Sequence, residues 1–180
     1  MSPALILIDL QKAIDHPAWG VRNNPQAEAM ACELLSAWRD RGWPIFHIKH
    51  DSTEPGSTYS PGQPGNEFKP ATAPLAGETV IAKRVNSAFI GTRLEAELRA
   101  NAISELVVCG VITNNSVETT VRHAANLGFQ VTLAEDACFT FAKSDWHGRP
   151  RSADEVHAMS LANLAGEYCA VKRTADILGG

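Results

Sequence analysis

The sequence lacks long hydrophobic runs and any excess of positive charge. None of its apolar runs approaches the ~20 residues that a helix needs to cross a bilayer. The formal net charge is −4, so the chain lacks the basic surplus that binds nucleic acid or an anionic membrane surface. No basic segment precedes the first apolar run, which argues against a signal peptide. We therefore predict that neither a membrane nor nucleic acid is a partner.

Closely spaced cysteines are also absent. The four cysteines, Cys32, Cys109, Cys138 and Cys169, are scattered and show no CxxC spacing. In a chain of 180 residues this usage is typical of reduced, mostly buried thiols rather than of a disulfide framework. We therefore expect a cytoplasmic protein.

Short apolar runs alternate with segments of helical spacing along the whole chain. With 44% hydrophobic residues, the composition favours a single folded domain over residues 1–180. The alternation predicts a three-layer α/β/α fold with a six-stranded, mostly parallel sheet and right-handed crossovers. The expected strands cover residues 4–10, 45–50, 78–83, 106–108, 130–135 and 169–172. Two polar segments, residues 51–77 and 136–151, are predicted to be long loops that cover a site or form an interface.

Two helix starts carry capping signals. Asn24 precedes Pro25 and is predicted to cap the helix that follows. Ser152 and Glu155 have the spacing of a capping box at the start of a later helix.

Three polar residues lie at or just after the carboxyl ends of predicted strands. Asp9 follows the apolar part of the first strand, Lys83 ends the third, and Ser116 follows the fourth near the first turn of a helix. Ligands of parallel α/β sheets bind at this edge, so these side chains are expected to converge. Because a helix N-terminus favours negative charge, a nucleophile at position 116 would have an oxyanion site beside it.

Several segments together resemble the isochorismatase-like, or cysteine hydrolase, family. They are residues 7–11 (LIDLQ), 80–83 (VIAK), 87–92 (SAFIGT), 110–113 (GVIT) and 117–120 (VETT). The resemblance implies a Rossmann-like six-stranded parallel sheet between helices and a homo-oligomer, a dimer or tetramer. It also implies hydrolysis of an amide or carbamoyl group by an Asp–Lys–Cys triad.

The residues of this chain match two of the three triad positions. Asp9 and Lys83 fall on the first two, and Ser116 stands where the family has its nucleophilic cysteine. The resemblance further implies a cis peptide at Val111–Ile112 and an oxyanion hole formed by the N–H groups of Ile112 and Ser116.

The serine leaves three hypotheses open, because an alcohol is a far weaker acid than a thiol and needs an adjacent base. Ser116 is a true nucleophile, or the chain acts without covalent catalysis and Asp9 protonates the substrate, or the serine is an inactivating replacement. The pKa of Asp9 matters to each hypothesis, since burial raises it and the Lys83 ammonium lowers it. The sequence leaves that balance open.

Three further residues are candidates for substrate binding. Gln11 lies two residues past Asp9, with a solvated loop amide as the alternative interpretation. Trp19 and Phe89 are candidates for walls around a planar substrate, with ordinary packing as their alternative.

Two histidines in the second predicted strand invite a metal hypothesis. His47 and His50 are three residues apart, so their side chains point to opposite faces of a strand. We therefore predict no metal site, and no motif indicates a cofactor.

The prediction as a whole is a hydrolase of a small-molecule C–N bond in an amide, carbamoyl or ureido compound. The alternatives are enol-ether hydrolysis with Asp9 as acid, and a catalytically silent subunit that binds a small molecule or joins an assembly.

Overall fold

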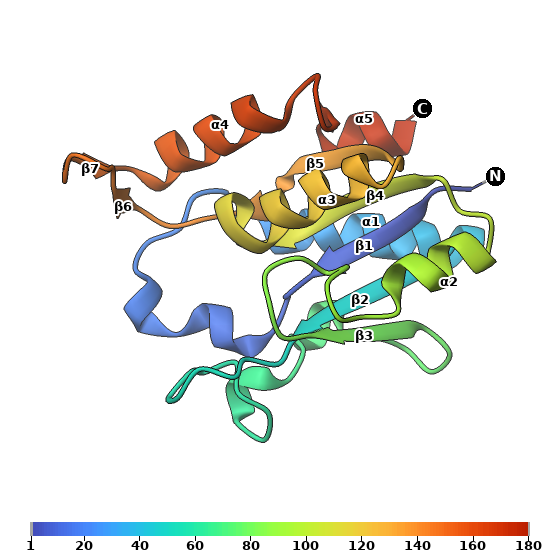
Figure 1. Ribbon diagram of the computed structural model, residues 1–180, viewed down its shortest axis with the longest axis horizontal. Coiled ribbons are helices and arrows are strands. Elements are labelled where there is room, and N and C mark those ends of the chain that lie inside the picture. Colours follow the sequence, from blue (N-terminus) through green and yellow to red (C-terminus); the bar gives the residue numbers. More distant parts are fainter. Residues whose placement is uncertain (1, 180) are drawn as a thin grey trace.

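The computed structural model describes residues 2–179, and its centre is a six-stranded sheet (Figure 1). The strands are β1 (Ala4–Ile8), β2 (Ile45–His50), β3 (Thr79–Lys83), β4 (Glu105–Val111), β5 (Gln130–Phe139) and β8 (Ala170–Lys172). They lie in the order β3-β2-β1-β4-β5-β8 and every neighbouring pair is parallel. The sheet confirms the predicted six-stranded fold. The strand order reverses between β1 and β4, which is where such sheets bind ligands.

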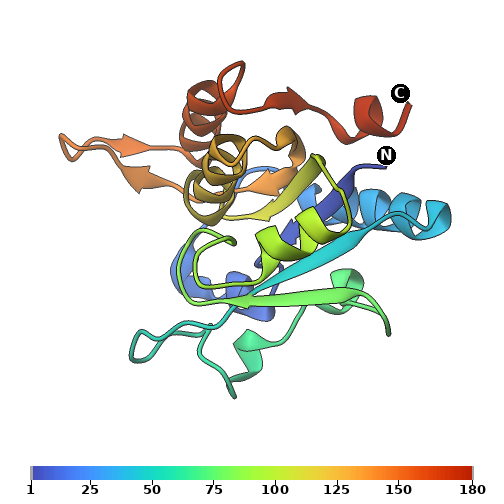
Figure 2. The same cartoon turned by 45° about the vertical axis from the view of Figure 1, so that its right-hand side comes forward.

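Helices cover both faces of the sheet (Figures 1 and 2). The helices α1 (Ala27–Arg41) and α5 (Thr174–Gly179) cover one face. The helices α2 (Leu94–Ala100), α3 (Glu118–Asn126) and α4 (Ala153–Leu164) lie on the other. With both faces covered, all five residues of β1 are buried, which explains its unbroken apolar sequence. No helix within residues 2–179 has the length and apolar character that crossing a membrane would require.

The two capping predictions have different outcomes. At α4 the Ser152 side chain accepts a hydrogen bond from the Glu155 backbone N–H, and the Glu155 carboxylate accepts one from that of Ser152, so the capping box is confirmed. At α1 the prediction was wrong, since Gln26 is the N-cap residue. The Asn24 amide instead donates hydrogen bonds to two carbonyl groups of β5, at distances of 3.0 and 2.8 Å.

The loops that follow β1, β2 and β5 contain short elements. The short helices η1 (Lys12–Asp15) and η2 (Pro17–Trp19) follow β1, and the segment 51–77 holds η3 (Pro64–Asn66) and η4 (Pro70–Thr72). The expected boundary at residue 135 was wrong, because β5 continues to Phe139 after a register shift opposite β4. Beyond it, β6 (Lys143–Ser144) and β7 (Pro150–Arg151) form a projecting hairpin that carries the 95% exposed Trp146 (Figures 1 and 2).

Candidate active site

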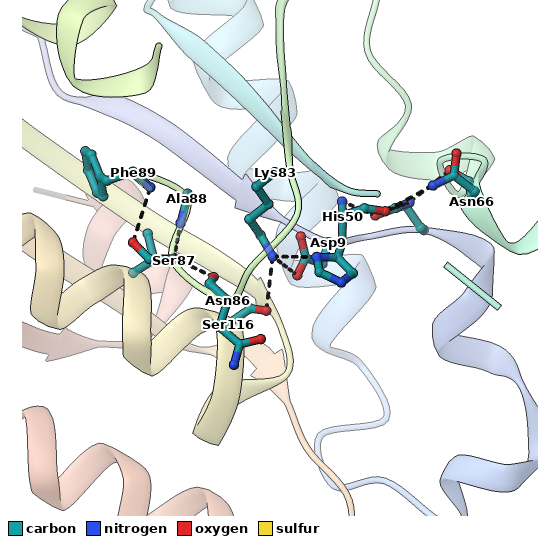
Figure 3. Close-up of polar contacts among 11 residues, drawn as sticks. Asp9, His50, Asn66, Lys83, Asn86, Ser87, Ala88, Phe89 and Ser116 are labelled. Carbon is teal, nitrogen blue, oxygen red and sulfur yellow. Dashed lines mark hydrogen bonds and ion pairs between the residues drawn. The ribbon is translucent and has the colours of Figure 1, made fainter. Parts of the chain in front are cut away.

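An ion pair between Asp9 and Lys83 lies at the carboxyl edge of the sheet. Asp9 directly follows β1, and Lys83 is the last residue of β3, two strands away. The long lysine side chain reaches past the end of β2, and its Nζ donates a hydrogen bond of 2.7 Å to Asp9 Oδ2 (Figure 3). The Lys83 side chain is fully buried and that of Asp9 is 6% exposed. The two predicted residues therefore meet away from bulk water.

The turn after β4 brings Ser116 to the same ammonium group. Gly110 has φ of +121°, and a Cβ built there would lie 2.2 Å from the carbonyl oxygen of Ile8, so only glycine lets β4 approach β1 this closely. A cis peptide joins Val111 to Ile112, as the resemblance implied. A wide helical turn, η5 (Thr113–Val117), then precedes α3. Lys83 Nζ donates a hydrogen bond of 3.2 Å to Ser116 Oγ (Figure 3).

Burial dominates the electrostatics of Asp9. Removal from water raises the pKa of its carboxyl group, and the charge and hydrogen bond of Lys83 lower it, with a net pKa above the ordinary value. Asp9 Oδ1 is buried and has no hydrogen-bond partner among residues 2–179. A carboxylate with a raised pKa and one free oxygen is suited to take up or release a proton.

A pocket of about 490 Å³ opens above these groups. This volume fits a small molecule. Asp9, Ile112 and Ser116 belong to its lining, together with Trp19, His50 and residues 84–86. The segment 51–77 contributes Ser52, Thr53, Glu54, Ser57 and Tyr59, so this long loop forms one wall of the pocket.

The three substrate-binding candidates are placed differently. Trp19 lines the pocket and stacks on Phe141 with ring centroids 5.6 Å apart. Phe89 is not among the lining residues, because it is buried in the core and stacks on Phe129. Gln11 is also absent from the lining, since it is fully buried and bonded to the backbone.

The Gln11 side chain fixes the end of β2 by hydrogen bonds to its backbone. Its Oε1 accepts a hydrogen bond of 2.7 Å from the His50 N–H, and its Nε2 donates one of 3.0 Å to the His50 carbonyl. The same Nε2 lies 2.9 Å from the Asn66 carbonyl oxygen. A buried amide with these partners fixes the neighbouring chain and has no donor left for a substrate.

His50 is a pocket residue whose role the sequence did not reveal. Its Nδ1 lies 3.3 Å from Lys83 Nζ (Figure 3). The residue is paired with Lys83 in the register of β2 and β3, and this pairing is the signal that would have placed it at the site. Burial and the Lys83 charge lower the pKa of His50, which favours a neutral imidazole.

The other histidine of β2 points away from this site, as predicted. His47 Nε2 lies 2.8 Å from Glu78 Oε2, in a pair whose histidine is buried and whose carboxylate is partly exposed. Within residues 2–179, no group of three or more His, Cys, Asp or Glu side chains is arranged to hold a metal ion.

Comparison with known proteins identifies the family of this chain. The family model described as "Isochorismatase domain" matches residues 3–176. The chain belongs to the isochorismatase family. The chain is 68% identical in sequence to an isochorismatase-family protein of known structure from Chromobacterium violaceum ATCC 12472. The TM-score between the two structures is 0.97, and the match covers 99% of this chain and 92% of the other.

Two curated relatives extend the comparison. The Bacillus subtilis (strain 168) isochorismatase family protein YrdC is 39% identical over 97% of this chain and 94% of its own length. Streptothricin hydrolase of Streptomyces noursei is 32% identical over 92% of this chain and 58% of its own length. The chain is thus an isochorismatase-family hydrolase, and its substrate has to be inferred from its own site.

Proposed function

We propose that this chain hydrolyses the C–N bond of a small amide, carbamoyl or ureido compound with Asp9, Lys83 and Ser116. One observation carries the proposal: a single buried ammonium hydrogen-bonds to a carboxylate and a hydroxyl on the floor of a pocket. This arrangement brings together a base, a charge and a nucleophile, which are the parts that acyl transfer requires.

In the first half of the proposed reaction, Ser116 Oγ attacks the carbonyl carbon of the substrate. Asp9 accepts the hydroxyl proton as the new C–O bond forms, and its raised pKa makes it a better base than an exposed carboxylate. The carbonyl oxygen becomes an oxyanion, for which the N–H groups of Ile112 and Ser116 are the proposed donors. When the C–N bond breaks, Asp9 returns the proton to the leaving nitrogen, and an acyl-serine remains.

In the second half, water releases the acyl group. Asp9 takes a proton from the water, whose oxygen attacks the acyl carbon, and then protonates Ser116 Oγ as the ester bond breaks. Lys83 keeps its proton throughout. Its charge offsets the negative charge that passes between Asp9, the oxyanion and the serine oxygen, which is worth more in a buried site than in water.

The raised pKa of Asp9 also supports a second candidate function. A carboxyl group that holds its proton can protonate an enol ether directly, and Asp9 Oδ1, which accepts no hydrogen bond from the described part of the chain, suits such a transfer. In that reaction water attacks the activated carbon and Ser116 forms no covalent bond.

Four forms of the protein separate these candidates. The wild type, Ser116→Ala, Ser116→Cys and Asp9→Asn are assayed against primary amides, ureas and enol ethers, with mass spectrometry of quenched reactions to detect an ester on Ser116. We expect wild-type amidase activity that falls about 10³-fold or more in Ser116→Ala. Activity that survives in Ser116→Ala and is lost in Asp9→Asn favours acid catalysis without a covalent step. Activity that arises only in Ser116→Cys contradicts both and favours a silent protein.

The remaining predictions concern the cell and the assembly. We propose that the protein is cytoplasmic and forms a dimer or tetramer in solution. Light scattering coupled to size-exclusion chromatography measures the mass of the particle, and a monomer over the whole concentration range contradicts the second statement.

A further inference from the structure

We propose that His50 is a specificity-determining residue, whose Nε2–H donates a hydrogen bond to an oxygen acceptor of the substrate. The inference rests on the proposed function for its kinetic consequences. Its structural premise, the position of the imidazole proton, stands apart from any activity.

The premise follows from the donors of Lys83. An ammonium group has three N–H donors and no acceptor. Among the described residues 2–179, three side-chain atoms lie within hydrogen-bond distance of Lys83 Nζ: Asp9 Oδ2 at 2.7 Å, Ser116 Oγ at 3.2 Å and His50 Nδ1 at 3.3 Å. All three N–H donors of the ammonium group have a hydrogen-bond acceptor if His50 Nδ1 carries no proton and accepts the third bond.

The proton of the neutral ring is therefore on Nε2. The opposite tautomer would point an N–H at an ammonium N–H, and a doubly protonated ring would add a second positive charge beside the first. The lowered pKa of His50 agrees with a neutral ring. His50 Nε2 has no hydrogen-bond partner within residues 2–179, and the residue belongs to the pocket lining beside Asp9 and Ser116.

The ring is held in place before any substrate arrives. Gln11 bonds to both the N–H and the carbonyl of His50, so the backbone is fixed on either side of the side chain. The ring of Tyr59 packs edge-on against the imidazole with centroids 5.6 Å apart. A donor fixed in this way loses little conformational entropy on binding, which is the condition for selecting one ligand group over another.

The chemical class of substrate follows from this donor. Beyond the scissile carbonyl, which the oxyanion donors receive, the substrate carries a second oxygen acceptor that reaches His50. A carboxylate and an uncharged carbonyl both fit this description. Hydrogen bonds to charged acceptors are stronger than those to neutral acceptors. Removal of the His50 donor should therefore lower kcat/KM more for a substrate with a carboxylate than for one with an uncharged carbonyl.

The proton position is tested by nuclear magnetic resonance of protein with ¹⁵N-labelled histidine rings, and His50→Gln identifies the His50 signals by their loss. We expect a proton on Nε2, none on Nδ1, and a ring that stays neutral as the pH falls below 6.5. A proton on Nδ1, or titration like that of a free histidine, overturns the inference. Either result is obtained even if the protein hydrolyses no amide.

The kinetic test compares three amides: succinamate with a carboxylate, succinamide with a second carbonyl, and pentanamide with no second acceptor. The readout is the ratio of kcat/KM for each acceptor-bearing amide to that for pentanamide, because a general loss of activity cancels in this ratio. His50→Phe is expected to lower it about tenfold for succinamide and up to about 100-fold for succinamate. His50→Gln, which keeps an N–H donor at similar reach, should restore much of the loss.

A matched control replaces an exposed histidine outside the pocket. His147→Phe changes the same residue type in the β6–β7 hairpin and should leave the ratios at their wild-type values.

Equal ratios in the wild type and His50→Phe overturn the inference while the hydrolase proposal stands. If the wild type hydrolyses none of the three amides, that proposal fails for this substrate class, and addition of succinate to the labelled protein provides the test. A shift of the His50 Nε2 signal then supports the inference, and its absence overturns it.

Discussion

The replacement of Lys83 by methionine provides a direct test of the buried ion pair. Methionine has an unbranched side chain of similar length, so the variant removes the charge and retains most of the packing. It leaves the Asp9 carboxylate buried, without a counter-charge, in a site where its other oxygen already has no partner among residues 2–179. Breaking a buried pair in this way costs about 3–5 kcal/mol of unfolding free energy.

The loss depends on pH, because Asp9 can escape the penalty by taking up a proton. In Lys83→Met the folded-state pKa of Asp9 rises further above its unfolded value of about 3.9. Between these two pKa values the folded chain binds more protons than the unfolded chain. Raising the pH through this window therefore lowers the unfolding free energy, by up to about 1.4 kcal/mol per pH unit. Below pH ~3.9 both states are protonated and this contribution is constant.

Urea denaturation measured from pH 5 to pH 8 provides the assay. With an m-value of about 2 kcal/mol per molar urea, the midpoint at pH 8 should fall by about 1.5–2.5 M, and by less at pH 5. Lys12→Met, which breaks an exposed pair with Glu67, should cost less than about 1 kcal/mol at either pH. A loss in Lys83→Met as small as this, with no dependence on pH beyond that of the wild type, would refute the account of Asp9.

Three further predictions concern the scaffold. Gly110→Ala should prevent soluble expression or lower the melting temperature by more than about 10 °C, since its Cβ would lie 2.2 Å from the Ile8 oxygen. Burial raises the pKa of Cys109 to about 12 and that of Cys138 well above its ordinary value, so at pH 8 neither thiol should react with Ellman's reagent until urea is added. Ser152→Ala should lower the unfolding free energy by about 1 kcal/mol in urea denaturation, through loss of the α4 cap, and an unchanged value would contradict that role.

The convergence of Asp9, Lys83 and Ser116 was predictable because it follows from topology. Parallel strands present their carboxyl ends at one edge, so residues at the ends of β1, β3 and β4 had to lie on the same side of the sheet. The net direction of the Asp9 pKa was not predictable, since it depends on how completely the surrounding loops exclude water.

The sequence predicted side chains less well where their partners come from distant segments. Gln11 was a candidate for substrate binding, but its amide hydrogen-bonds to His50 and Asn66, which are 39 and 55 positions away. Phe89 packs in the core and Asn24 reaches β5, and neither contact leaves a local pattern in the chain. His50 could have been assigned to the pocket only from its register opposite Lys83.

The position of Trp19 gives the protein a built-in optical probe. This indole lines the pocket and is 38% exposed, whereas Trp38, a residue of α1, is buried. Of the four tryptophans, Trp146 on the hairpin has the most exposed side chain, at 95%, so its emission should be the most accessible to quenching by water. After Trp146→Phe, a change in fluorescence when a compound is added would report occupancy at Trp19, and libraries of unlabelled compounds could then be screened for ligands without a turnover assay.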